Sequence, residues 1–284
     1  MNAPETSQTI SNLPRDEALR RRYGPDHAAL PAMPESAIFD ALLRHRSVRA
    51  YSSKPLPPGT LELLIAAGQS AASSSNLQVW SVVAVEDQGR KDRLSVFANN
   101  QAHIRQCPLL LLWVADLSRL DRVAQARGTT AEGNQYLEML LVGAIDAALA
   151  AQNAVVAAES LGLGTVYLGA MRNHPEEVAA EVGLPPNAMV VFGMCVGYED
   201  PAALAADVKP RLSQTTILHH ERYSSDHEAA AVADYNATLN DFQASQNMPA
   251  SEWSKQSTNR VSVRGLSGRD ALSASLRKMG FGIK

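Results

Sequence analysis

The chain has 284 residues, which is enough for one large domain or two small ones. Hydrophobic residues make up 45% and charged residues 19%, as in an ordinary globular protein with a sizeable core. The net charge of -3 argues against a nucleic-acid-binding protein, which usually carries a basic face, although a few local cations can still bind a small anion.

The first 34 residues are polar and interrupted by proline, and they have no apolar core of the kind found in a secretory signal. We interpret residues 1–34 as an extension outside the core fold. Arg20–Arg22 are expected on the solvated face of a short helix, although they could bind phosphate. The extension is expected to be partly ordered, because it contains apolar side chains that can pack: Leu13, Leu19, Tyr23 and Leu30.

After the extension, helical and strand patterns alternate, which predicts an α+β or α/β sandwich around a mixed sheet. Helices are expected near 38–43, 60–69, 135–161, 175–182, 226–244 and 268–280, and short buried strands at 79–85, 109–114, 166–168 and 189–196. Segments 198–212 and 245–265 are expected to be irregular. The division predicted is an extension at 1–34, a core at 35–225 and a C-terminal excursion at 226–284.

Several classes of site are disfavoured. Cys107 and Cys195 are expected to be buried thiols in strands, with no disulfide framework and no metal site, which fits a reducing cytoplasm. The most apolar segment, 139–163, contains polar residues such as Asp146, so it is expected to be a buried helix and not a membrane span. There is no nucleophile elbow, no P-loop and no G-x-G-x-x-G turn after a strand.

Three polar clusters remain, each weak by itself. His45-Arg46-Ser47-Val48-Arg49 offers two guanidinium forks and a hydroxyl to an anion, but a charge run at a helix end is the more ordinary interpretation. The run 73–78, SSSNLQ, is a hydroxyl-rich turn between a buried helix and a buried strand, and is taken to be buried too. Lys209-Pro210-Arg211 presents two cations, which alone indicate only a surface loop.

Taken in order, the motifs resemble the flavin-reductase and oxygen-insensitive nitroreductase branch of the nitroreductase family. The resemblance spans about residues 36–225 and is closest at 157–173, AAESLGLGTVYLGAMRN, and at 209–212, KPRL. It implies an α+β sandwich with a mixed, mainly antiparallel sheet, assembled as a domain-crossing homodimer with two FMN sites at the interface.

The resemblance also implies the cofactor-binding residues, with no metal. Those expected to contact FMN are His45, Arg46, Ser47, Arg49, Ser73, Ser75, Leu77, Gln101, Tyr167, Gly169, Ala170, Lys209 and Arg211. Ser73 and Ser75 are expected to reach FMN from one subunit, either the same one or the partner. Ala170 departs mildly from the glycine that is common in the family at this position. Lys209, beside N1 and O2 of the flavin, is expected to stabilise the reduced form.

The chemistry implied belongs to the flavin, so no protein base or nucleophile is expected. NADPH or NADH donates a hydride to FMN and leaves, and a nitroarene, a quinone or a free flavin then takes its place. NADPH is slightly favoured by the resemblance, although segment 246–253 lacks the Arg expected before Trp253 for the 2′-phosphate. Two alternatives stay open: a flavin reductase that supplies reduced FMN to a partner monooxygenase, and a non-catalytic flavin-binding module.

Overall fold

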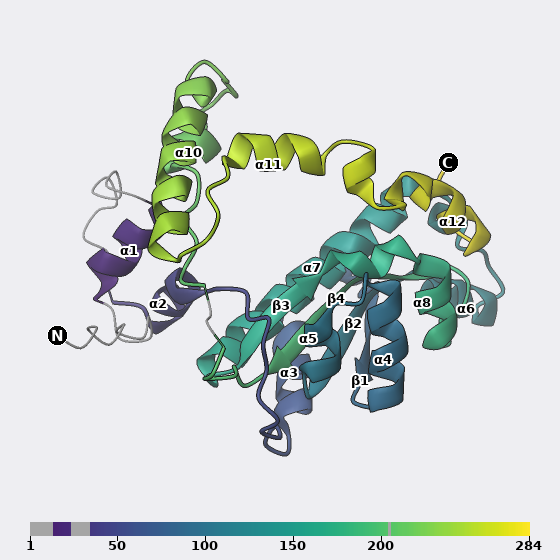
Figure 1. Cartoon of the computed structure of the whole chain (residues 1–284). Helices are drawn as coiled ribbons and strands as arrows, with labels where there is room; N and C mark the ends of the chain where they lie inside the picture. The colour runs from purple at the N-terminus through teal and green to yellow at the C-terminus, as the bar shows by residue number, and fades with distance from the viewer. Residues whose placement is uncertain (1–13, 24–34, 204–205) are drawn as a thin grey trace, which may run out of the picture. The chain divides into compact units, whose positions relative to one another are not determined.

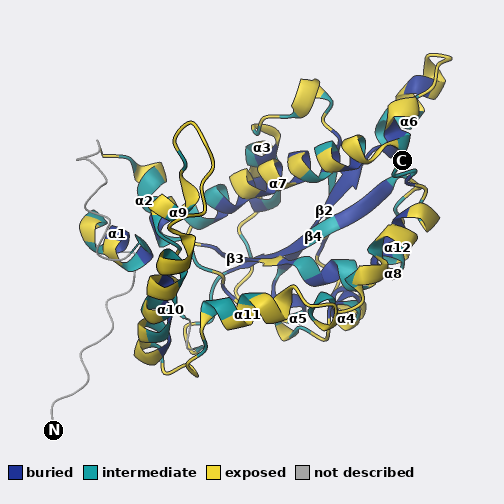
Figure 2. Cartoon of the chain, turned by 90° about the horizontal axis from the view of Figure 1, so that it is seen from above, coloured by how far each residue is buried: buried dark blue, intermediate teal, exposed yellow. Residues whose placement is uncertain are grey.

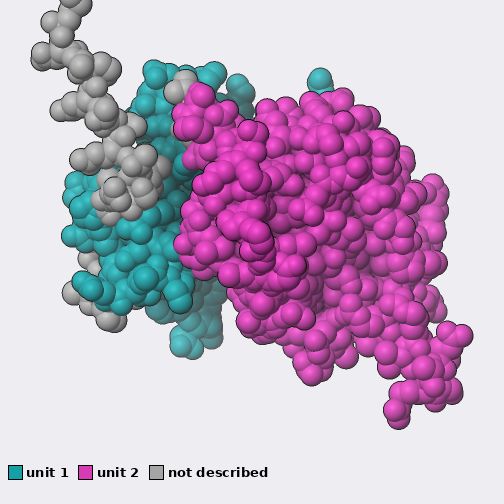
Figure 3. All heavy atoms as spheres, turned by 90° about the horizontal axis from the view of Figure 1, so that it is seen from below, with its two compact units in different colours: residues 1–46, 206–265 teal, residues 47–205, 266–284 magenta. Residues whose placement is uncertain are grey.

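The computed structural model describes residues 14–23, 35–203 and 206–284. Contacts divide the chain into two compact units, which Figure 3 colours separately. The first unit consists of residues 1–46 and 206–265, and the second of residues 47–205 and 266–284. Each unit therefore contains pieces from both ends of the chain, and each is described by itself below.

The second unit is built on a four-stranded antiparallel sheet with the strand order β1-β2-β4-β3. The strands are β1 (Trp80–Val85), β2 (Leu109–Asp116), β3 (Gly164–Leu168) and β4 (Ala188–Gly197). All four were expected, within a few residues at each end. Among the described residues, a parallel pairing appears at the isolated bridge between Ser47 and Thr165. The α+β class with an antiparallel sheet is thus confirmed.

The sequence of strand β2 is an uninterrupted apolar run because both of its faces are buried. Leu110, Leu112 and Val114 belong to one hydrophobic cluster, whereas the alternating residues Leu109, Leu111 and Trp113 belong to another. Successive side chains of a strand point to opposite faces, so a strand covered on both faces needs an apolar residue at every position.

Helices cover both faces of this sheet (Figures 1 and 2). One face packs against α3 (Thr60–Gln69) and α7 (Leu137–Ser160), and the other against α4 (Gln88–Phe97), α5 (Ala102–Gln106) and α8 (Pro175–Glu181). The unit also contains α6 (Ser118–Ala126) and α12 (Leu272–Lys278). Helices α4, α5 and α6 were not predicted, because each is short and rich in polar residues.

Helix α7 is long and apolar enough to cross a membrane by length and composition alone. In the fold it packs on the sheet through small residues such as Ala150, Ala151 and Ala154, which are fully buried. Asp146 on the same helix is buried and accepts two hydrogen bonds from the loop after α3. The expected buried helix is therefore confirmed, with its bounds moved by one or two residues.

The first unit is helical over its described residues. It contains α1 (Arg15–Tyr23), α2 (Ala37–Arg44), α9 (Gln214–Ile217), α10 (Glu228–Ser245) and α11 (Trp253–Arg260). Ala18 and Leu19 of α1 pack with Leu43 of α2, and Tyr23 lies against the same cluster. Leu13 and Leu30, which were also expected to pack, lie outside the described residues.

Four further expectations need correction. Segment 245–265 is not irregular throughout, because α11 lies within it. The helix expected at 268–280 is regular only at 272–278. Cys107 is buried at the end of α5 and not in a strand, whereas Cys195 lies buried in β4 as expected. Arg22 is not solvated, because its side chain is buried.

Short 3-10 turns complete the chain. They are η3 (Ser74–Asn76), η4 (Glu132–Gln135), η5 (Gly169–Asn173), η6 (Arg264–Leu266) and η7 (Arg269–Ala271). Two of these turns, η3 and η5, coincide with segments expected to bind the cofactor.

Candidate functional site

A cavity of about 350 Å³ opens in the second unit where β3 ends. This volume is within the range of small-molecule sites. Two strands and one helix line the cavity. The lining residues are Tyr167 and Gly169 at the end of β3, Phe192 in β4, Ala148 and Gln152 in α7, and Arg172. Two of the residues predicted from the sequence, Tyr167 and Gly169, therefore line one cavity.

Tyr167 forms an aromatic wall of this cavity. Its ring packs edge-on against Phe192 with the centroids 5.1 Å apart, and its hydroxyl lies 3.4 Å from Oε1 of Gln152. The residue is 37% exposed, while burial of the titrating group, followed by the nearby charge of Glu159, raises the Tyr167 pKa. The side chain is therefore a neutral phenol at physiological pH, suited to packing and not to proton transfer.

Gly169 lies between two cations that the sequence analysis did not single out. A Cβ atom placed on Gly169 would be 3.4 Å from Nη2 of Arg172 and 3.7 Å from Nη1 of Arg269. Arg172 also donates a hydrogen bond to the carbonyl of Val191. The missing side chain thus leaves the Gly169 backbone open beside two guanidinium groups. Arg172 falls within the motif 157–173, but Arg269 lies 100 residues further along without any local signal.

The segment Ser47–Arg49 is attached to the first residues of β3. The Val48 amide donates to the Thr165 carbonyl at 2.9 Å, and the Tyr51 hydroxyl donates to the Val48 carbonyl at 2.8 Å. Val48 packs so closely on Gly164 that a Cβ at Gly164 would lie 2.7 Å from the Cβ of Val48. This close approach places Ser47 and Arg49, both exposed, next to the strand that leads to Tyr167.

His103 is a further polar residue near Arg49. Burial and then the positive charge of Arg49 lower the His103 pKa, so the ring is neutral at pH 7. Its Nε2 atom is buried and has no hydrogen-bond partner among the described residues. Gln101 precedes it by two residues as the half-buried N-cap of α5. The second unit therefore brings the charge of Arg49 close enough to affect His103.

The serine run lies in a different part of the second unit, between α3 and β1. Asp146 accepts hydrogen bonds from the Ser73 hydroxyl at 2.7 Å and from the Ser74 amide at 3.1 Å. Ser75 has a left-handed backbone with φ of 49°. Ser74 and Ser75 are exposed, so the expectation that this run is buried is wrong. Neither is among the residues that line the cavity, and Leu77 packs half-buried in the core.

Ala170 is also outside the cavity. Its side chain is buried in the cluster beneath the sheet, while its neighbour Gly169 faces the cavity. A methyl group at residue 170 is therefore accommodated in the core of the fold.

The remaining predicted residues belong to the first unit. His45 and Arg46, both half-buried, follow α2, and Lys209 and Arg211 are exposed on either side of the buried Pro210. The two segments are more than 160 residues apart in sequence, yet both contact Arg22: the carbonyls of His45 and Lys209 accept from its guanidinium at 2.7 Å and 3.5 Å. The first unit thus joins two predicted segments through one side chain that was not predicted.

Comparisons with known proteins identify the family of the chain. The sequence model of the Nitroreductase family matches residues 42–198, and that of the Nitroreductase family C-terminal domain matches residues 209–284. The NADPH-flavin oxidoreductase of Vibrio harveyi is 35% identical over 228 residues, covering 78% of this chain and 90% of that protein.

Two solved structures are also similar over most of the chain. Nitroreductase A from Vibrio parahaemolyticus has a TM-score of 0.79 and 33% identity, and covers 88% of this chain and 100% of its own. The NADPH:FMN oxidoreductase from Vibrio harveyi, solved in complex with NAD+, has a TM-score of 0.77 and 31% identity with the same two coverages.

Proposed function

Because the chain belongs to the nitroreductase family, we propose that it is an FMN-dependent oxidoreductase that oxidises NADPH or NADH. The related protein of Vibrio harveyi is named an NADPH-flavin oxidoreductase, and a similar structure is named an NADPH:FMN oxidoreductase. The observation that carries the proposal is the cavity at the end of β3, where an aromatic wall and an open glycine backbone lie beside cationic side chains.

The residues present fit FMN. A flat ring system needs a largely apolar cavity with few polar groups, and the cavity lined by Tyr167, Phe192 and Ala148 has that character. A phosphate needs several cations, and the exposed Arg49 is the candidate for this contact in the second unit. Arg46 and Arg211 of the first unit remain predicted phosphate contacts on the strength of the family resemblance. The buried Nε2 atom of His103 lacks a protein partner among the described residues, but His103 is not among the residues that line this cavity.

Each group of residues has a role in this proposal. Tyr167 and Gly169 contact the isoalloxazine, and Ser47 and Arg49 of the second unit contact the phosphate end of FMN. Gln101, His45, Arg46 and Arg211 remain predicted contacts on the strength of the family resemblance. Lys209 stabilises negative charge at the pyrimidine end of the ring. Ser73, Ser75, Leu77 and Ala170 remain predicted contacts on the strength of the family resemblance.

Bound FMN would supply the redox chemistry, taking a hydride from the nicotinamide and passing two electrons to an acceptor in a ping-pong sequence. The protein binds and orients the two substrates in turn. A glycine at residue 169 leaves space over the ring, and Arg172 and Arg269 beside it offer positive charge to an anionic substrate. We propose nitroarenes, quinones and free flavins as acceptors, because an open cavity admits many planar molecules.

A homodimer completes this proposal. Helix α7 exposes four large apolar side chains at intervals of four residues: Leu137, Leu141, Ile145 and Leu149. Such a stripe on one helix face is typical of a subunit interface. Asp146, which holds the serine loop, lies on the same helix, and this supports the proposal that Ser73 and Ser75 contact FMN bound to the partner subunit.

The donor is proposed to be NADPH rather than NADH, on the names of the relatives. The segment before Trp253 lacks cations, so any contact to the 2′-phosphate has to come from other residues, for example Lys255 or Arg260. Rates of turnover with NADH and NADPH at equal concentration decide this point, and a strong preference for NADH would refute it. A cytoplasmic location remains a prediction.

A flavin reductase that releases reduced FMN is the second candidate, favoured by the name of the Vibrio harveyi relative. It uses the same site residues but predicts weakly held FMN and rapid reduction of added free flavin. A non-catalytic flavin-binding module predicts tight FMN and negligible oxidation of the nicotinamide.

One experiment tests these proposals together. The purified chain is mixed with FMN, freed of unbound flavin and titrated anaerobically with NADPH and with NADH while the flavin absorbance is followed. Nitroarene, quinone and free FMN are then added separately. We expect bleaching by the nicotinamide and recovery with each acceptor. A chain that retains no flavin even from excess FMN, or that holds FMN without bleaching, contradicts the enzyme proposed.

A further inference from the structure

Arg22, in the last turn of α1, is a buried cation surrounded by backbone carbonyls. Only 5% of its surface is exposed. Its Nη2 atom donates to the carbonyls of Leu42 at 3.3 Å, Leu43 at 3.0 Å and His45 at 2.7 Å, and its Nη1 atom lies 3.5 Å from the carbonyl of Lys209. The side chain therefore joins two stretches of chain that are remote in sequence.

The first stretch is the end of helix α2. Leu42 and Leu43 are in its last turn, and His45 is its C-cap residue. Carbonyls at a helix C-terminus lack intrahelical partners and carry partial negative charge, so a guanidinium group satisfies them and favours this end of the dipole. Arg22 thereby fixes where α2 stops and where the His45-Arg46 segment begins.

The second stretch is the segment 207–211. Its backbone returns the contact, because the Arg211 amide donates to the Arg22 carbonyl at 2.8 Å. The Tyr235 hydroxyl of α10 donates to the Pro210 carbonyl, also at 2.8 Å. Pro210 is buried while Lys209 and Arg211 are exposed, so the backbone is held and the two cationic side chains are left at the surface.

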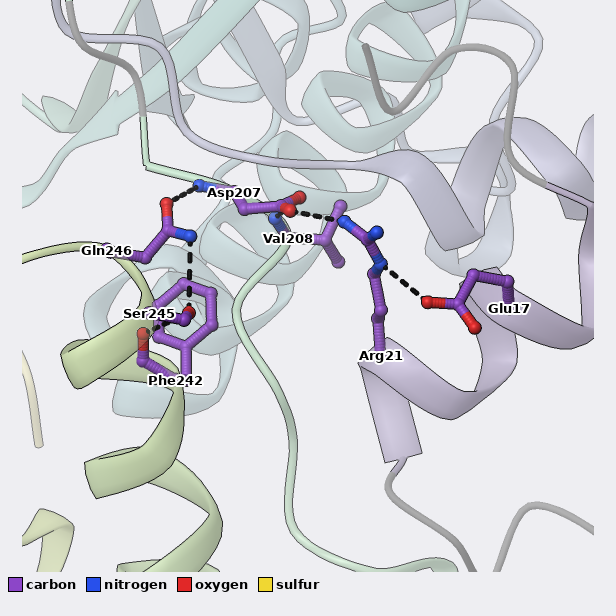
Figure 4. Close-up of polar contacts among 7 residues, drawn as sticks. All are labelled: Glu17, Arg21, Asp207, Val208, Phe242, Ser245 and Gln246. Carbon is purple, nitrogen blue, oxygen red and sulfur yellow. Dashed lines mark hydrogen bonds and ion pairs between the residues drawn. The ribbon is translucent and has the colours of Figure 1, made fainter. Parts of the chain in front are cut away.

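The residue before Arg22 strengthens this attachment, as Figure 4 shows. Arg21 pairs with Asp207 at 2.5 Å and with Glu17 at 3.0 Å. The Asp207 amide in turn donates to Oε1 of Gln246, in the C-cap of α10, at 2.9 Å. At the other end of α1, Arg15 pairs with Asp40 of α2 at 2.7 Å. Helix α1 is therefore bound by polar contacts both to α2 and to 207–211.

We propose that Arg22 is a positioning residue for the FMN phosphate: it holds the His45-Arg46 segment and the Lys209-Arg211 segment at a fixed separation, so that Arg46 and Arg211 meet one anion. This inference rests on the proposed function. It makes part of the N-terminal extension a support of the cofactor site, although Arg22 itself does not touch FMN.

The physical argument concerns preorganisation. Like charges repel, so Arg46 and Arg211 converge on a phosphate only if the backbone that carries them is held in place. A buried guanidinium group with several carbonyl acceptors can hold that backbone, since it supplies donors in a rigid fork. Loss of the fork removes a donor from the carbonyls of Leu43 and His45, whereas the Leu42 carbonyl keeps the His45 amide and the Lys209 carbonyl keeps the Arg211 side chain. The two segments can then separate, which weakens binding of the phosphate more than binding of the ring.

Riboflavin, which has the ring and the ribityl chain but no phosphate, distinguishes these two effects. Dissociation constants for FMN and riboflavin are measured by flavin fluorescence in the full-length chain, as wild type and as Arg22→Met, Arg22→Lys and Arg20→Met. Methionine keeps much of the apolar length of Arg22 without donors, and lysine keeps the charge without the fork. Arg20 is exposed on the same helix and serves as the matched control.

We expect Arg22→Met to raise the dissociation constant of FMN at least about tenfold, or about 1.4 kcal/mol, while that of riboflavin changes by less than about threefold. Arg22→Lys should give an intermediate loss, and Arg20→Met should match wild type for both ligands. Thermal unfolding of each variant is recorded, and binding is compared well below the lowest melting temperature. This comparison separates a loss of folded protein from a loss of phosphate affinity.

Equal weakening of FMN and riboflavin in folded Arg22→Met, or no change in either, overturns the positioning role. If Arg22→Met fails to fold, the comparison is made on Arg22→Lys, where an FMN-to-riboflavin affinity ratio equal to that of wild type has the same consequence. Failure of the proposed function is a different result: the wild-type chain then binds neither ligand.

Discussion

Substitution of Gly164 by alanine tests how the segment Ser47–Arg49 is attached to the sheet. An added Cβ would lie 2.5 Å from Cγ2 of Val48, 2.7 Å from its Cβ and 2.9 Å from its Cγ1. Real carbon atoms do not approach so closely, and the β-branched side chain of Val48 has little rotamer freedom with which to move away. The backbone of residue 48 therefore has to shift.

Such overpacking of a core contact costs about 1–3 kcal/mol. We expect the upper half of this range, because the Val48 Cβ itself is in the way and the 2.9 Å hydrogen bond from the Val48 amide to the Thr165 carbonyl has to lengthen. The free energy of unfolding is measured by urea denaturation of apo-protein. Gly133→Ala is the matched control, since the nearest atom to a Cβ there is 3.9 Å away.

A double-mutant cycle with Val48→Ala identifies the cause. Removing the two methyl groups of Val48 relieves part of the clash, so Gly164→Ala should cost about 1 kcal/mol less in the Val48→Ala background. The shift of residue 48 also displaces its neighbours Ser47 and Arg49, so FMN affinity should fall in Gly164→Ala and not in Gly133→Ala. An equal cost of Gly164→Ala in both backgrounds would refute the steric explanation.

Two further predictions concern His103 and the apolar stripe of α7. Burial and then Arg49 lower the His103 pKa in the folded chain, while the unfolded chain takes up a proton near pH 6.5, so stability should be lost as the pH falls below about 6.5. Urea titrations between pH 7.5 and 5.5 measure the free energy of unfolding, and His103→Gln should reduce its loss over this range. The exposed His220→Gln should not reduce it. Identical pH profiles for His103→Gln and wild type contradict the reasoning. Leu141→Glu should convert the proposed dimer to monomer in light scattering, because it puts a charge into the stripe, and Val123→Glu on α6 should leave the mass unchanged. A wild-type chain that is monomeric at all concentrations would refute the dimer.

The sequence alone was sufficient for the sheet and for the long core helix. Strands such as β2 are buried on both faces, so their apolar runs are continuous and can be recognised locally. The order of the polar motifs was also sufficient to identify the family, although none of them was specific alone. Short helices such as α4 and α5 were not predicted, because their contacts with the sheet stabilise them and their own periodicity does not.

The roles of individual polar residues depended on tertiary structure. Arg22 belongs to a run of three arginines that predicts a solvated face, and its burial becomes evident only where the carbonyls of 42–45 and 209 surround it. Asp146 interrupts an apolar helix without any sign that it accepts from Ser73, and Arg269 reaches the surroundings of Gly169 from a distant segment. Secondary structure follows from side-chain periodicity along a few turns or strands, whereas the partner of a buried charge is set by contacts between segments that the linear order keeps far apart.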